Sequence, residues 1–130
     1  MATFVVDGGL DITTNRLKGS GTEPLNVGWG TGAGTTTRSD TSLFTAALVD
    51  LTAGNTDHTA GTSTRQTTNT TNDTYQVIAT RTATGAGTVT NAGLWDAASG
   101  GNLFLKGDFT GIGLSSGDAI QFTIKAIFDN

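Results

Sequence analysis

A chain of 130 residues, of which 35% are hydrophobic and only 14% charged, can form one domain around one modest core. Its net charge of −4, its seven scattered basic residues and its lack of cysteine argue against a nucleic-acid partner, disulfides and thiolate metal sites. Threonine and glycine dominate instead. Because β-branched threonine favours strands and glycine favours turns, the composition predicts an all-β fold.

The first half of the chain contains two expected strands, at residues 4–6 and 25–30, and a flexible glycine-rich loop at 31–37 follows the second. For residues 41–49 two interpretations stay open: a short helix capped by Asp40, or a strand through residues 46–49. The N-terminus lacks the basic start and long apolar run of a signal peptide. No stretch is apolar enough to predict a membrane span.

Residues 52–74 contain no apolar side chain larger than alanine, so we expect no contribution from them to the core. A polar segment of this length in a small domain is usually disordered or functional. It is expected to be either an arm that becomes ordered across a neighbouring subunit, or a mobile surface loop with some polar β pairing.

The second half of the chain is the most regular part. Strands are expected at residues 75–83, 88–95, 103–109 and 119–128, separated by turns about every ten residues. In the last strand the even positions are apolar, which predicts one face on a core and one polar face. This pattern is typical of an antiparallel β-sandwich or jelly roll, here a single domain over residues 1–130 with the polar segment 52–74 as a loop or arm.

Catalytic and metal-binding chemistry finds little support in the residues. The only histidine, His58, lies in the polar segment and is expected to be solvated, and the eleven acidic residues show no clustered ligand spacing. A calcium ion held by loop oxygens and an Asp pair acting on a glycan remain minor alternatives. The glycines of residues 28–34 lack a phosphate-loop pattern. We expect no enzyme activity, no cofactor and no small-molecule substrate.

Two tryptophans, Trp29 and Trp95, are the largest apolar side chains and each has an apolar neighbour in the sequence. Such residues usually pack in a core or an interface, and the alternative is that they stack on sugar rings.

Several segments together resemble small virion proteins of tailed bacteriophages. They are residues 91–109 (NAGLWDAASGGNLFLKGDF) and 112–128 (IGLSSGDAIQFTIKAIF), with VGWGTGAG at 27–34 and DTSLF at 40–44 further upstream. The resemblance leaves residues 52–74 unmatched. Within that group it implies a head decoration (cement) protein or, as the alternative, a receptor- or glycan-binding tail or fibre module. Exposed tryptophans would favour the tail or fibre module, whereas buried ones would favour the cement protein.

Cement proteins bind capsomer junctions on the outer capsid surface, often as trimers. The resemblance therefore implies a virion component assembled in the host cytoplasm, with the major capsid protein and other copies of itself as partners. Strand edges and chain termini are expected to make these contacts. The residues expected at the interface are Ala2, Thr3, Phe4, Val5, Val6, Trp29, Trp95 and Phe128.

Overall fold

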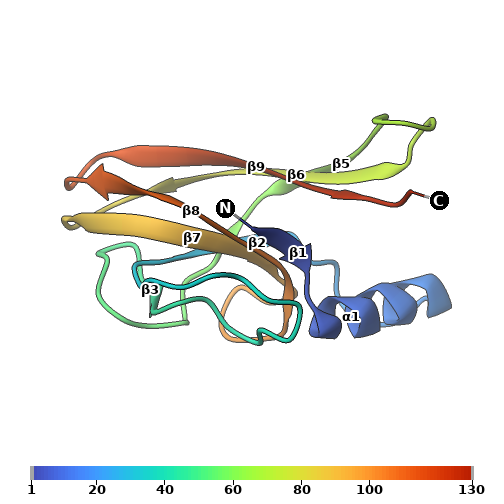
Figure 1. Cartoon of the computed structure of the whole chain (residues 1–130), viewed down its shortest axis with the longest axis horizontal. Coiled ribbons are helices and arrows are strands. Elements are labelled where there is room, and N and C mark those ends of the chain that lie inside the picture. The colour runs from blue at the N-terminus through green and yellow to red at the C-terminus, as the bar shows by residue number, and fades with distance from the viewer. Residues whose placement is uncertain (1, 130) are drawn as a thin grey trace.

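The computed structural model describes residues 2–129 as two antiparallel sheets packed face to face, with one helix at an end (Figure 1). Sheet A has the order β1 (Thr3–Val5), β8 (Leu103–Leu114), β7 (Gly87–Trp95), β2 (Asn26–Gly30) and β3 (Ala46–Ala47), and β4 (Thr59–Ala60) also pairs with β2. Sheet B has the order β5 (Thr62–Gln66), β6 (Thr74–Thr82) and β9 (Ala119–Ile127). The predicted all-β sandwich is confirmed.

The alternating pattern of the last strand places its even side chains on the core, as expected. Phe122 and Ala126 of β9 are buried, and Ile120 and Ile124 are partly buried. The pattern ends with the strand, because Phe128 lies beyond Ile127 and its side chain is 56% exposed. The inward-facing set is therefore one residue shorter than the sequence predicted.

The core between the sheets centres on Trp29, whose ring meets the edge of Phe122 at a centroid separation of 6.5 Å. The side chains of Val27, Val77 and Leu94 around it are fully buried. Each such side chain contributes roughly 1.5–3 kcal/mol when it leaves water, before conformational entropy is subtracted. Trp29 is thus a core residue, which agrees with the expectation that it packs in a core or an interface.

The only helix of the described chain, α1 (Asp7–Lys18), was not predicted from the sequence. Its N-cap, Val6, makes no side-chain cap, and Gly9 is a poor helix former. Tertiary packing explains the glycine, because a Cβ at Gly9 would lie 2.2 Å from the carbonyl oxygen of Phe104. The helix ends at Gly19, which has the left-handed φ of 90° that favours glycine. Among residues 2–129 no helix is long and apolar enough to cross a membrane.

Residues 41–49 form no helix. Ala46 and Ala47 form β3 and pair with Gly30 and Trp29, so the strand alternative is realised over two residues. Preceding this strand, Phe44 hydrogen-bonds through both its N–H and its carbonyl to the side chain of Asn91. These long-range bonds satisfy backbone groups that a helix would have used locally.

The polar segment 52–74 lies along the chain's own sheets. Its residues form β4 and β5, and β5 pairs with β6 from Thr62 opposite Ile78 to Gln66 opposite Thr74. Asp73 organises the turn between β5 and β6, because its carboxylate accepts hydrogen bonds from the N–H groups of residues 68–70. Polar β pairing, one of the two expected alternatives, therefore describes part of this segment.

Candidate functional site

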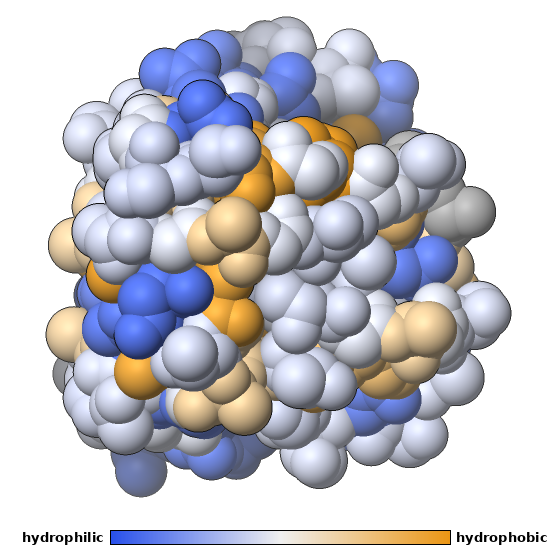
Figure 2. All heavy atoms as spheres, turned by 90° about the vertical axis from the view of Figure 1, so that its left-hand side faces the viewer, coloured by the Kyte–Doolittle hydropathy of each residue, from blue (hydrophilic) through white to orange (hydrophobic). Residues whose placement is uncertain are grey.

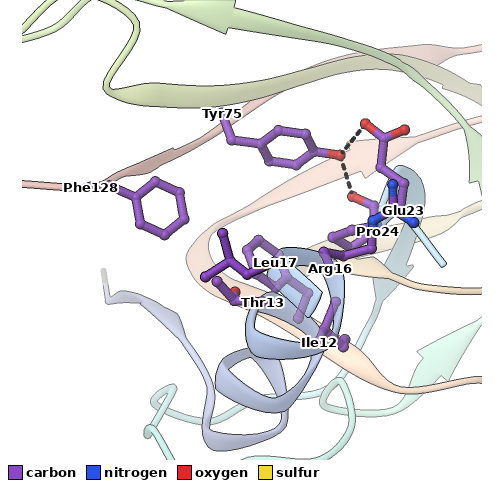
Figure 3. A pocket seen from close by; sticks show the side chains of 9 residues that line it. Ile12, Thr13, Arg16, Leu17, Glu23, Pro24, Tyr75 and Phe128 are labelled. Carbon is purple, nitrogen blue, oxygen red and sulfur yellow. Dashed lines mark hydrogen bonds between the residues drawn. The ribbon is translucent and has the colours of Figure 1, made fainter. Parts of the chain in front are cut away.

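A groove of about 380 Å³ lies at one end of the sandwich. One wall is α1 and the other is the end of sheet B, which extends past sheet A above the helix (Figures 1 and 3). The lining residues are Ile12, Thr13, Arg16 and Leu17 of α1, Glu23 and Pro24 of the following loop, Tyr75, Phe104 and Phe128. We call this hollow the end groove.

The end groove exists because α1 fills the end of the core only in part. Ile12 is buried against the sheets, but Leu17, one turn and a half further along the helix, is 83% exposed. Across the groove stands Phe128, 56% exposed, on the chain that continues β9 (Figure 3). Isolated exposed apolar residues are ordinary, but several around one concave surface indicate an interaction site.

Polar groups border the groove on one side. The hydroxyl of Tyr75 lies 3.1 Å from Oε1 of Glu23 and 3.0 Å from the carbonyl oxygen of Pro24 (Figure 3). Burial, together with the negative charge of Glu23, raises the pKa of Tyr75, so the phenol stays protonated and remains a donor. Arg16 donates a hydrogen bond to the carbonyl of Gly21. These hydrogen bonds fix the loop after α1 against sheet B.

A second hollow of about 340 Å³ continues the end groove on the far side of Tyr75 and Phe128. Arg65, Asn72, Asp73 and Thr74 complete its lining. Backbone N–H groups of the turn, together with the hydroxyl of Thr74, hold the pKa of Asp73 far below its usual range, so its carboxylate is ionised. The two hollows form one surface with an apolar centre and charged groups at its margins.

The opposite end of the sandwich differs in character. Figure 2 views that end, where most side chains are of intermediate hydropathy and the apolar areas are small. The two tight connections there, after β6 and after β8, consist largely of small and polar residues. The two most exposed large apolar side chains, Leu17 and Phe128, lie at the α1 end.

The structure separates the residues predicted at the interface. Phe128 lies in the end groove, and Thr3 and Phe4 are exposed on the edge strand β1, with Phe4 39% exposed. Ala2 and Val5 are partly buried. By contrast Val6, Trp29 and Trp95 are at most 1% exposed and offer no surface to a partner.

The groove residues from α1 carried no signal in the sequence analysis, because the helix itself was not expected. Leu10, Thr13 and Leu17 follow helical spacing, which is the pattern that points to one side of such a helix. Tyr75 was placed correctly on a strand, but its position at an open end depends on how far sheet B extends.

Two buried cations were also missed, and both attach loops to the sandwich. Lys106 of β8 donates 2.9 Å hydrogen bonds to Asp40 and to the carbonyl of Ser42, and its amine lies 3.2 Å from the centre of the Phe44 ring. Although burial alone would raise the pKa of Asp40, hydrogen bonds from Lys106 and Thr37 lower it overall. This pair holds the loop before β3 against sheet A.

Arg81 of β6 makes the equivalent attachment across the core. Its guanidinium donates to the carbonyls of Val27 and Asp57 and to the Asp57 carboxylate, 3.2 Å away, and lies over the ring of Trp29. Burial lowers the pKa of Arg81 but leaves it charged, because Asp57 opposes the shift. Both cations have partners inside the chain, so their role is structural.

The expectation of a solvated His58 is wrong. Its ring stacks on Trp95 at a centroid distance of 4.7 Å, and its Nδ1 lies 2.8 Å from the carbonyl oxygen of Ala97. Gly28 makes room for this stack, because a Cβ there would come within 3.0 Å of both rings. Within residues 2–129 no group of three His, Asp or Glu side chains could hold a metal ion.

The chain matches one family of known proteins. A family model described as podophage GP4 fiber I protein gp80 matches residues 13–128, which include strands β2 to β9 and all of the groove lining except Ile12. No curated protein and no solved structure matches the chain significantly. The chain is a phage virion structural protein, and it belongs to the podophage GP4 fiber I protein family.

Proposed function

We propose that this chain is a structural subunit of a phage tail fibre that docks on a neighbouring virion protein through its end groove. The observation that carries the proposal is the family match, which spans residues 13–128. The end groove adds the contact surface, because an assembling subunit needs apolar area that becomes buried only in the particle.

The chemistry of the groove suits a protein segment. Leu17 and Phe128 offer two large apolar side chains, and each contributes roughly 1.5–3 kcal/mol when fully removed from water. The hydroxyl of Tyr75 and the charges of Arg16 and Glu23 can orient the backbone of an incoming chain. An apolar side chain inserted between α1 and sheet B would complete the open end of the core.

Capsid decoration, the function first expected from the resemblance, is the second candidate. A cement subunit would also be a small sandwich with a docking surface, with the major capsid protein as its partner. The family description favours the fibre over the capsid. Glycan binding through tryptophan finds no support, since neither Trp29 nor Trp95 is exposed.

Locating the chain in the intact virion tests the proposal. We expect cryo-electron microscopy of particles that carry an epitope on the exposed turn at residues 115–118 to show label at the tail, in low copy number. Hundreds of copies over the shell would establish the decoration function and overturn the fibre proposal.

Exchange of one groove residue tests the docking surface. A phage that encodes Leu17→Asp should assemble particles depleted in this chain, because the charge would be buried at the contact. Ile112→Asp is the matched control, since Ile112 is also an exposed apolar residue (40%) but lies on β8 outside the groove. Equal incorporation of both variants would contradict docking through the end groove.

A further inference from the structure

The strands at the edges of the two sheets differ greatly in length. The other described edges are shorter: three residues in β1, two each in β3 and β4, five in β5, and the part of β8 that β1 does not cover, residues 109–114. β9 has nine residues, pairs with β6 in one continuous register, and has no pairing strand on its other side. It contains no proline and one charged residue, Lys125. Natural proteins usually protect long regular edges, so an unprotected one indicates a strand-pairing site.

The backbone groups that face the open edge can be assigned. Phe128 donates its N–H to the carbonyl of Asp73, and Ala83 donates to the carbonyl of Asp118. Because residues of an antiparallel strand alternate in the direction of their hydrogen bonds, the even-numbered residues of β9 bond to β6. The residues whose N–H and C=O groups point to the open edge are therefore Ala119, Gln121, Thr123, Lys125 and Ile127.

The side chains beside this edge lack full cover. Ile120 and Ile124 point toward the core but are only partly buried. On the adjacent strand β6, Val77 and Ala79 in the same layer are at most 5% exposed. A further strand paired with β9 would cover Ile120 and Ile124, just as β9 itself covers Val77 and Ala79 of β6.

We propose that β9 pairs antiparallel with β9 of a second copy of this chain, about a two-fold axis at Thr123. In this register Thr123 faces its own counterpart, Gln121 faces Lys125, and Ala119 faces Ile127. On the core side, Phe122 faces Ile124 and Ile120 faces Ala126. Apolar residues meet apolar residues in one layer, and no two charges of the same sign are directly opposed, so the strand is complementary to itself. Pairing joins two three-stranded sheets into one six-stranded sheet.

The proposed partner is a second copy of the chain. The inference rests on the proposed fibre function only for where in the virion the two copies meet. The end groove and the β9 edge are separate contacts, so one can dock on a different virion protein while the other joins two copies. The trimer implied by the resemblance would need β9 to pair with a different edge, such as β5 or the uncovered part of β8. Experiments on the purified chain therefore test the pairing independently of where the protein lies in the particle.

Charged variants at the axis provide the first test. Thr123→Asp and Thr123→Lys each place two like charges face to face, and the exposed position lets both variants fold as monomers. We expect each variant alone to have a dimer dissociation constant raised about fivefold or more in sedimentation, and an equimolar mixture to recover dimer. Thr80→Asp, an exposed change on β6 away from the edge, should leave association unchanged.

A single cysteine provides the second test, since the chain has none of its own. Thr123→Cys should form an intermolecular disulfide under mild oxidation, because facing residues of a hydrogen-bonded pair lie about 5.5 Å apart between Cα atoms. Thr80→Cys is the control and should stay reduced, as two intervening strands separate it from its counterpart. A wild-type chain that is monomeric at high concentration would overturn the pairing. A trimer whose association is unchanged by Thr123→Asp and Thr123→Lys would also overturn it, as would equal cross-linking of Thr123→Cys and Thr80→Cys.

Discussion

Two lysines of this chain occupy similar sequence settings and end in opposite environments. Lys106 and Lys125 are each the only basic residue of a mainly apolar strand, and each points to the outer side of its sheet. Lys106 is fully buried under a loop that supplies Asp40 and a carbonyl, whereas Lys125 is exposed. The difference lies in what covers each sheet, because a buried charge persists only where partners from elsewhere in the chain satisfy it.

The same contrast holds for the two outer faces as a whole. The loops around β3 lie beneath sheet A, on the side away from sheet B, and they bury Asn91 and Trp95 (Figure 1). Sheet B carries no such layer, so Ile78, Thr80 and Thr123 remain exposed. The outer side of sheet A is thus a small second core, whereas the outer side of sheet B is a free surface.

Removal of Asp40 should have the largest effect on this contrast. Asp40→Ala leaves the buried amine of Lys106 without its carboxylate, and we expect the free energy of unfolding to fall by about 3 kcal/mol. Urea denaturation followed by circular dichroism measures the loss. Asp11→Ala, at an exposed helix position, is the control and should change stability by less than about 0.5 kcal/mol. A loss no larger than that of the control would show that the loop does not depend on the ion pair.

Mild acid should also destabilise the fold, by less than Asp40→Ala does. Burial lowers the pKa of His58 in the folded chain, so the unfolded chain binds the proton more readily. The stabilisation is complete above the unfolded pKa of about 6.5 and is lost as the pH falls through the folded pKa. Thermal unfolding between pH 7.5 and 5.5 should show this decline, and His58→Gln should reduce it. An unchanged slope in the variant would assign the pH dependence to other groups.

Changes on the free face of sheet B should have the smallest effect. Thr80→Val retains the β-branched shape on an exposed strand position, so we expect a shift within about 0.5 kcal/mol of the wild-type stability. The matched change on the covered face, Asn91→Ala, removes the side chain that bonds both backbone groups of Phe44 and should cost about 2 kcal/mol. Similar losses for the two variants would mean that both faces are equally packed.

Local patterns were sufficient to predict the sandwich and most of its strands, because the alternation of apolar residues in a strand such as β9 can be read from neighbouring positions. The sequence also placed Phe128 and the N-terminal strand among the contact candidates. It did not predict α1, since Gly8 and Gly9 lower helix propensity and only close packing on Phe104 makes them suitable. The end groove was not predicted either, because α1 forms one of its walls.

Which polar residues are buried depends on contacts between distant parts of the chain. Lys106, Arg81 and His58 look like surface residues in the sequence, and their burial depends on partners 24 to 66 positions away along the chain. The open edge of β9 is likewise a property of the assembled sheets, because an edge is defined by the strand that is missing beside it. Local patterns fix which residues form strands, whereas long-range contacts fix what lies on either side of them.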